Sequence, residues 1–289
     1  MYSAEINRKQ PALLLILVDQ SYSMSEPWGT SGQSKANTLA LAVNRLLGNA
    51  VLQCSKGDNR VHDYFEVGVV GYGADITLAL HGADPARPVL PIGEVARNPR
   101  RVDQVMRRMS DGAGGIMEVP MNAAVWIDPV TNGPTPMVEA FQTAEKVVSA
   151  WCHLHPTSFP PIVINLTDGV STDGDPSAAA EAIRSVGTDD GQALLFNLHL
   201  SALAAGEVVF PSSAATLVDR HASHLFEMSS VLPAQMAEAA SGLGYGITEG
   251  ARGFLYNAQV TSVIDFLDIG TRAVTPTGLK ELGGGDPTS

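Results

Sequence analysis

Cysteine is scarce in this 289-residue chain, and its two copies, Cys54 and Cys152, lie far apart without Cys-x-x-Cys spacing. This scarcity argues against a disulfide scaffold and a cysteine zinc site, and it fits a reducing compartment. Long hydrophobic runs are missing too. The apolar run Leu13–Val18 is too short to span a bilayer, and no later segment reaches the ~18 apolar residues of a membrane helix. We therefore expect a soluble, cytoplasmic protein without a membrane partner.

Positive charge is also in short supply, because 18 Lys and Arg residues stand against 30 Asp and Glu residues, giving a formal net charge of -12. Such a balance argues against sequence-independent binding of nucleic acid or of an anionic membrane. Basic residues do concentrate between Arg97 and Arg108. We interpret them as the solvated face of a helix at Pro99–Met109, the alternative being a surface for an acidic protein partner.

Several catalytic signatures are absent. The chain has neither the Gly-x-Ser-x-Gly turn of serine hydrolases nor a Gly-x-x-x-x-Gly-Lys-Ser phosphate loop, and it has no dinucleotide fingerprint. A phosphotransfer role for Asp19 would require a second acid two residues later, where Ser21 stands. The histidine pairs, 153 with 155 and 221 with 224, have no cysteine cluster or third ligand, so solvated or core histidines are expected.

What the chain does contain is an alternation of buried strands and helices. We predict strands at 11–19, 65–73, 76–80, 162–166, 193–200 and 225–226, and helices at 34–52, 136–152, 176–186, 213–222, 233–242 and 259–273. The first strand is apolar on both faces, as in a parallel strand covered by helices on two sides. The pattern predicts an α/β fold with a doubly wound, mostly parallel sheet and one antiparallel edge strand, at 76–80.

Polar oxygens gather directly after the first strand, in the segment Asp19-Gln-Ser21-Tyr-Ser23. In an open α/β sheet, the carboxyl ends of the strands are where ligands bind. Three hard oxygens at alternate positions suit a hard divalent cation better than zinc or copper. For any one of these residues, a helix cap or a turn that bonds its own backbone is the simpler interpretation.

Two later loops supply further oxygens. Thr135 lies in Asn132-Gly-Pro-Thr-Pro-Met, directly before a predicted helix, and Asp168 ends a buried strand in Thr-Asp-Gly. With these loops, the chain resembles the von Willebrand factor A (vWA) domain and its metal-ion-dependent adhesion site, over about residues 11 to 245. The resemblance assigns the metal ligands to Asp19, Ser21, Ser23, Thr135 and Asp168.

The resemblance implies a function in binding and not in catalysis. Hydroxyl ligands are neutral and leave much of the ion's charge uncompensated, so an octahedral Mg²⁺ would have a position for a partner's Asp or Glu carboxylate. Ca²⁺ and Mn²⁺ are the alternatives. A metal-dependent hydrolase would need a general base near the ion, and no His or Glu is placed there by sequence.

Within the vWA family, the chain looks similar to bacterial cytoplasmic members, in particular the TerY-like proteins of tellurite resistance and related stress loci. The segments Gly71-Tyr-Gly73 and Gly133-Pro-Thr-Pro-Met137 carry that similarity. It implies a stress-response or phosphosignalling role with a protein kinase or a type 2C protein phosphatase as partner. An adaptor role for a MoxR-type AAA+ ATPase is the other possibility.

The domain division follows from the same reading. We predict a vWA domain at 1–250 with an irregular insertion at about 81–134, a helical extension at 251–275 and a mobile tail at 276–289.

Three further residues accompany the site. Asp173 and Asp175 are expected to cap the following helix or to add negative field near the ion, and Trp28 either to contact a partner or to pin its own loop.

Overall fold

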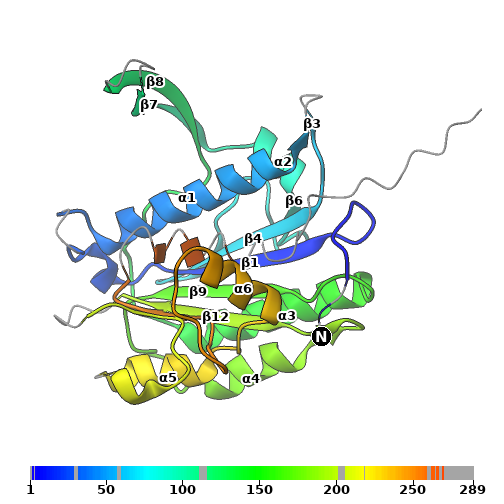
Figure 1. The fold of residues 1–289 in the computed structure, drawn as a ribbon, viewed down its shortest axis with the longest axis vertical. Coiled ribbons are helices and arrows are strands. Elements are labelled where there is room, and N and C mark those ends of the chain that lie inside the picture. Colours follow the sequence, from blue (N-terminus) through cyan, green and yellow to red (C-terminus); the bar gives the residue numbers. More distant parts are fainter. Residues whose placement is uncertain are drawn as a thin grey trace, which may run out of the picture.

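The fold is an α/β sandwich built on one eight-stranded sheet with helices on both faces (Figure 1). The computed structural model describes residues 2, 4–28, 32–56, 60–110, 116–200, 206–217, 219–258, 262–263, 265–266 and 269. The strand order is β13-β14-β12-β9-β1-β4-β5, with β6 also pairing with β4. The predicted α/β class with a mostly parallel sheet is confirmed.

The centre of the sheet is parallel and buried. Its strands are β1 (Ala12–Asp19), β4 (Phe65–Tyr72), β9 (Ile162–Thr167), β12 (Leu194–His199) and the short β14 (Phe254–Tyr256). Every residue of β1 is buried, as the apolar pattern on both faces predicts. β14 was not predicted, because a three-residue apolar segment is too short to show a period.

Antiparallel strands close both edges of the sheet. β5 (Ile76–Leu78) and β6 (Leu90–Pro91) pair antiparallel with β4, and β13 (Val208–Val209) pairs antiparallel with β14. The prediction of an antiparallel return at 76–80 is therefore confirmed, but the prediction of a single antiparallel edge strand is wrong. The second edge depends on β14, which had no sequence signal of its own.

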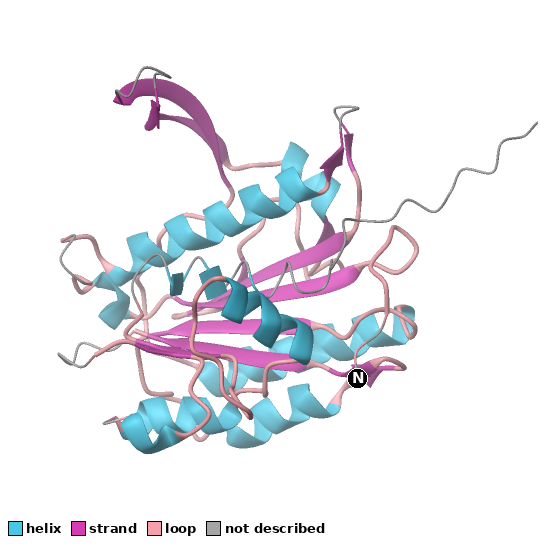
Figure 2. Ribbon diagram, in the orientation of Figure 1, coloured by secondary structure: helices cyan, strands magenta, loops and turns pink. Residues whose placement is uncertain are grey.

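Two sets of helices cover the two faces of the sheet (Figure 2). One face carries α1 (Lys35–Gln53), α2 (Ile92–Arg97) and α6 (Ala234–Gly242), and the other carries α3 (Met137–Leu154), α4 (Ser177–Ser185) and α5 (Arg220–Met228). Side chains of β1 alternate between the two cores: Leu14 and Ile16 join the first, while Leu13 and Leu15 join the second. This alternation follows from the two-residue period of a strand.

The segment predicted as a helix at Pro99–Met109 is instead a strand. β7 (Arg101–Ser110) pairs antiparallel with β8 (Ile116–Val125), and the two form a ribbon that projects from the body of the protein (Figure 1). Val105 lies opposite Met121 in this pair, so cross-strand contacts replace the expected helical face. The arginine cluster is consequently not a helical surface, and Arg101 pairs with Asp103 and Asp128.

The region before α6 also differs from prediction. The helix predicted at 213–222 is a short 3-10 helix, η2 (Ala214–Thr216), followed by α5, whose first turn is capped by Asp219 accepting the His221 N–H at 2.8 Å. The strand predicted at Leu225–Phe226 is wrong, because both residues lie inside α5. Asp is a favoured N-cap residue, so the helix begins after Asp219, later in the chain than the predicted start at residue 213.

Shorter elements complete the described chain. They are the 3-10 helix η1 (Tyr22–Ser25) and two small hairpins, β2 (Ser55–Lys56) with β3 (Arg60–Val61) and β10 (Gly187–Thr188) with β11 (Gly191–Gln192). Of the helix predicted at 259–273, the described residues 262, 263, 265, 266 and 269 are helical. The predicted tail lies outside the described residues, and the predicted division into domains stays a prediction.

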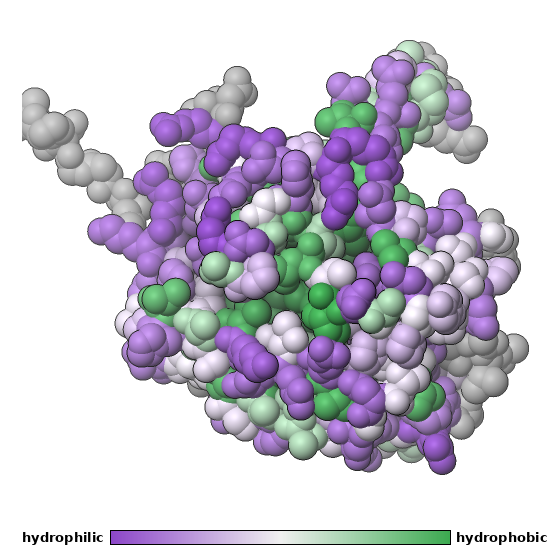
Figure 3. Space-filling model, turned by 180° about the vertical axis from the view of Figure 1, so that it is seen from behind, coloured by the Kyte–Doolittle hydropathy of each residue, from purple (hydrophilic) through white to green (hydrophobic). Residues whose placement is uncertain are grey.

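Hydrophobic surface is limited on the far side of the molecule. Seen from behind, that face is mostly hydrophilic, and hydrophobic residues gather in a hollow near its middle (Figure 3). Within the described part of the chain, every helix is too short or too polar to pass through a lipid bilayer.

Candidate metal centre

The predicted site lies where the direction of sheet winding reverses. β1 is flanked by β4 on one side and by β9 on the other, so the chain leaves β1 and β9 at the same edge of the sheet. The helices that follow these two strands, α1 and α4, cover opposite faces. Such a switch point leaves a crevice between the two loops, which is where open α/β sheets bind ligands.

Asp19, the last residue of β1, has a buried carboxylate. Its side chain accepts the Ser21 N–H at 2.9 Å through Oδ1 and the Thr167 hydroxyl at 2.7 Å through Oδ2, and the residue is 1% exposed. Burial raises the pKa of Asp19 to about 6, although hydrogen bonds from Ser21 and Thr167 act in the opposite direction. A cation placed beside this carboxylate would favour its charged form.

The two serines form a chain of hydroxyls that leads to the second acid. Ser21 Oγ lies 3.0 Å from Ser23 Oγ, and Ser23 Oγ donates to Asp168 Oδ1 at 2.7 Å. Ser21 stands just before η1, yet its side chain makes no capping hydrogen bond. The simple capping interpretation therefore fails for Ser21, whereas Asp19 does bond its own turn.

Thr135 reaches the same place because its loop is tied to the first one. Gly133 has a φ of +75°, and a Cβ there would lie 2.3 Å from Ala74 N, so the turn requires glycine. The Gly133 carbonyl accepts the Tyr22 N–H at 3.0 Å, and the Asn132 N–H donates to the Gln20 carbonyl at 2.6 Å.

Gly169 marks the point of convergence. A Cβ at Gly169 would lie 3.6 Å from Thr135 Oγ1 and 3.9 Å from Ser23 Oγ, so both hydroxyls lie beside the turn that carries Asp168. Thr135 is 4% exposed, and among the described residues its Oγ1 has no hydrogen-bond partner. All five predicted residues are thus brought together, although their role as metal ligands stays a prediction.

Lys35 is the residue that sequence reasoning missed. Its ammonium group donates to Asp168 Oδ2 at 2.7 Å and to Glu26 Oε2 at 2.8 Å, and its side chain is 3% exposed. Burial lowers the pKa of Lys35, but hydrogen bonds to Asp168 and Glu26 outweigh it and leave the pKa above its usual value. No local signal could reveal this contact, because a lysine in the first turn of a helix is usually solvated.

The side chains present fit a hard divalent cation. The five predicted ligands offer only carboxylate and hydroxyl oxygens, which is the donor type that Mg²⁺ and Ca²⁺ prefer. Asp19, Asp168 and Glu26 contribute three negative charges and Lys35 one positive charge, so the group has a formal charge of −2. One divalent cation would balance that charge.

The neighbouring acids and Trp28 have structural roles. Asp173 accepts the Val138 and Glu139 N–H groups at 3.1 and 2.9 Å and so caps α3, not the following helix. Asp175 accepts the Ser177 N–H at 2.9 Å at the start of α4, as predicted. Trp28 is 8% exposed and belongs to the core, which favours the prediction that it pins its own loop.

The histidine pairs do not assemble into a second centre. Among the residues that the structure describes, no group of three or more His, Cys, Asp or Glu side chains is arranged to hold a metal. His155 stacks on Trp151 with ring centroids 4.6 Å apart, and His224 lies 3.3 Å from Asp175.

No protein-family model and no curated protein sequence matches this chain. Among solved structures, it is similar to proximal thread matrix protein 1 from the mussel byssus, at 12% identity over 94% of this chain and 49% of that one, with a TM-score of 0.48. A second structure of the mussel protein has zinc in its MIDAS motif. The pilus adhesin SpaC of Lactobacillus rhamnosus GG shows 12% identity over 94% of this chain and 32% of that one, with a TM-score of 0.49. The conserved hypothetical protein BatB of Bacteroides thetaiotaomicron shows 12% identity over 91% and 98%, with a TM-score of 0.43. The chain therefore spans about half of the mussel protein and about a third of the adhesin.

Proposed function

We propose that this chain is a vWA-type module that recognises a protein partner through a bound divalent cation. The observation that carries the proposal is the convergence of all five predicted ligands at the carboxyl ends of β1 and β9. These residues come from three separate loops, so their meeting is not a consequence of local sequence. The cation, when bound, supplies a position for an acidic side chain of the partner.

The chain's own residues would divide the work of holding the ion. Ser21, Ser23 and Thr135 offer neutral oxygens, while Asp19 and Asp168 offer charge. We propose Mg²⁺ as the natural ion, with Ca²⁺ or Mn²⁺ as substitutes, because hydroxyl, carboxylate and water oxygens suit octahedral Mg²⁺. Lys35 holds Asp168 in place and offsets part of the charge.

The proposed role is binding without catalysis. Hydrolysis would require a general base poised beside the ion. Glu26, a carboxylate that the fold brings close to the predicted set, is already bonded to the Lys35 ammonium. That engagement supports a holding function for the site.

The cellular setting is a finer proposal. We infer a bacterial cytoplasmic TerY-like role in stress response or phosphosignalling, with a kinase or a type 2C phosphatase as partner, from the resemblance of the Gly71–Gly73 and Gly133–Met137 segments. An adaptor for a MoxR-type AAA+ ATPase would present the same site to a different partner. The identity of the captured protein separates the two.

The test is affinity capture from a lysate of the source organism, with wild-type protein and Asp19→Ala, each in Mg²⁺ and in EDTA. We expect proteins that are retained only by wild type and only with Mg²⁺, and that elute when EDTA is added. Asp128→Ala serves as the control, since Asp128 is about half-exposed and pairs with Arg101 away from the site.

Partner binding that survives both chelation and Asp19→Ala would overturn the proposal. Metal-dependent turnover of a captured protein or of a phosphoester, abolished by the same substitution, would instead establish the hydrolase alternative.

A further inference from the structure

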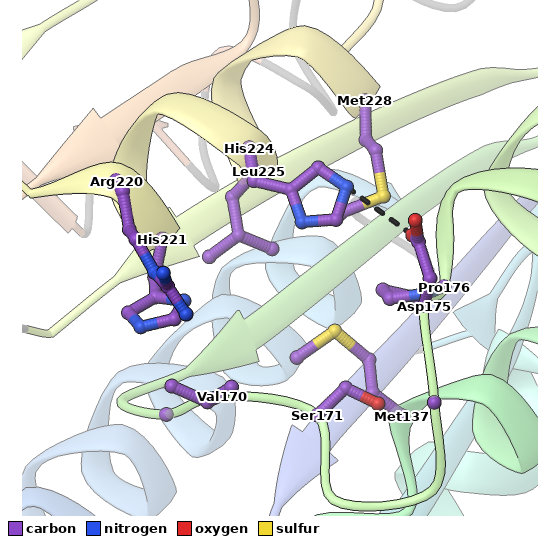
Figure 4. A pocket seen from close by; sticks show the side chains of 12 residues that line it. Met137, Val170, Ser171, Asp175, Pro176, Arg220, His221, His224, Leu225 and Met228 are labelled. Carbon is purple, nitrogen blue, oxygen red and sulfur yellow. Dashed lines mark ion pairs between the residues drawn. The ribbon is translucent and has the colours of Figure 1, made fainter.

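A pocket of about 440 Å³ lies beside the candidate metal centre (Figure 4). Its walls come from the start of α3, the loop that follows β9, and α5. The volume falls within the range of ligand-binding pockets. No role in the fold or in metal binding accounts for this pocket.

The pocket and the metal centre share a wall. Gly169, which lines the pocket, is the residue whose Cβ would touch the Thr135 and Ser23 hydroxyls. The wall is fixed by a reciprocal pair of bonds, in which the Thr135 N–H donates to Thr172 Oγ1 at 3.0 Å and the Thr172 N–H donates to the Thr135 carbonyl at 2.9 Å. A protein segment with a carboxylate at the metal centre would therefore place its neighbouring residues at the mouth of the pocket.

The pocket is lined on its inner side by apolar side chains. Met137, Leu225 and Met228 are 2%, 3% and 3% exposed, and Val170 at the mouth is 48% exposed. Two methionines, Met137 from α3 and Met228 from α5, adapt to apolar groups of different shape, since their side chains are unbranched and flexible. This lining suits a large apolar side chain.

The charges at the mouth are not evenly shared. Figure 4 shows Arg220 and His221 side by side at one end, and His224 facing Asp175 at the other. His224 is bonded there, 2.6 Å from Ser177 Oγ and 3.3 Å from Asp175. Within the described part of the chain, the exposed Arg220 guanidinium has no acidic partner. Since the chain as a whole is strongly acidic, this cationic end is suited to an acid brought by another molecule.

We propose that the pocket is a specificity subsite for the protein partner, which receives a large apolar side chain close in sequence to the metal-bound acid. Arg220 pairs with a second acid of the same segment. The inference rests on the proposed function, because the first acid is held by the metal ion. The recognised element is thus a short acidic segment with one large apolar residue.

The test is selection of short random peptides displayed on phage against the whole protein in Mg²⁺, followed by affinity measurement of the enriched peptides. We expect enriched sequences with an acid, a nearby Leu, Met or Phe, and a second acid. Val170→Asp and Arg220→Glu should each lower the affinity for these peptides about tenfold while leaving the affinity for Mg²⁺ unchanged.

Two matched substitutions near the amino ends of the parallel strands, at the far end of the sheet from the metal centre, serve as controls. Val231→Asp changes a residue that is 51% exposed, and Arg8→Glu changes an exposed arginine in the turn before β1. Both should bind the peptides as wild type does.

The outcomes separate the two ideas. Peptides that need Mg²⁺ and an acid but show no apolar preference, and that ignore Val170→Asp and Arg220→Glu, would overturn the subsite and leave the proposed function standing. Peptides that bind equally well in EDTA and to Asp19→Ala would overturn the proposed function and the subsite together.

Discussion

The ammonium group of Lys35 lies 2.7 Å from Oδ2 of Asp168, and both side chains are almost fully buried. Lys35 begins α1, and Asp168 follows β9 by one position, so the partners of this ion pair are 133 positions apart in the chain. Without a metal ion, the Lys35 ammonium supplies positive charge to the predicted ligand set, because it donates directly to Asp168, one of the two carboxylates in that set.

We expect Lys35→Met to destabilise the metal-free protein by about 3–5 kcal/mol, since removing one partner of a buried pair leaves an uncompensated charge. Saturating Mg²⁺ should restore more stability to Lys35→Met than it adds to wild type, because the ion supplies the missing positive charge. Urea unfolding in EDTA and in Mg²⁺ measures both effects. Lys146→Met, at an exposed position of α3, is the control. Equal stabilisation of both proteins by Mg²⁺ would show that the ion and Lys35 do not act on the same carboxylate.

Mg²⁺ should stabilise wild type and raise its thermal midpoint. The gain in the free energy of unfolding should reach about 2.7 kcal/mol when the ion is at 100 times its dissociation constant. Asp19→Asn should abolish that gain, and Ser21→Ala and Thr135→Ala should reduce it, because each removes one oxygen from the predicted set. Ser25→Ala should keep the full gain, since the exposed Ser25 hydroxyl donates to the Tyr22 carbonyl and lies outside the predicted set. Titration of the midpoint with Mg²⁺ provides the measurement. An unchanged gain in Asp19→Asn would refute the assigned ligands.

His199 should make the protein sensitive to acid. Burial holds the pKa of His199 below its usual 6.5, although Asp219, 3.1 Å from its Nε2, acts in the opposite direction. The unfolded chain therefore takes up this proton at a higher pH than the folded chain does. The contribution of neutral His199 to the free energy of unfolding is complete above pH 6.5. It declines as the pH falls below that value, with a slope of at most about 1.4 kcal/mol per pH unit.

The acid effect is measured by urea unfolding of wild type and His199→Gln across this range. We expect a shallower loss of stability for the substituted protein, whose side chain does not titrate. Parallel curves for the two proteins would assign the acid sensitivity to other groups.

A buried polar chain crosses the sheet and should be costly to break. Tyr72 donates its hydroxyl to Asn165 at 2.7 Å, Asn165 donates to Asn197 at 3.0 Å, and Asn197 donates to Ser229 at 3.0 Å. Asn165→Leu would remove the acceptor of the Tyr72 hydroxyl bond and the donor to the Asn197 amide oxygen. We expect a loss of about 2–6 kcal/mol, at about 1–3 kcal/mol for each orphaned group.

Chemical unfolding of Asn165→Leu checks the estimate, and Ser158→Ala is the control. The Ser158 hydroxyl is buried without a hydrogen-bond partner among the described residues, so its removal should not reduce stability. A loss in Asn165→Leu no larger than in Ser158→Ala would contradict the importance of the chain.

The main strands could be predicted because their residues report their own surroundings. An apolar pattern on both faces marks β1 as a central strand. Asp19 is the last residue of β1 and Asp168 directly follows β9, which places both acids at the carboxyl ends of the parallel strands. The wrong predictions fall where no long period exists. β14 has three residues, and β7 depends on pairing with β8 across a hairpin.

By itself, the sequence determines the α/β class, since strand periodicity is a local property that a chain carries before it folds, and its resemblance to the vWA domain implies the five candidate ligands. Only the tertiary structure decides how those ligands are held. It sets Lys35 against Asp168, binds the Gly133 turn to Tyr22, and opens the pocket beside Gly169. These contacts join residues far apart in the chain, so no local sequence pattern could predict them. Burial of the polar groups strengthens the contacts.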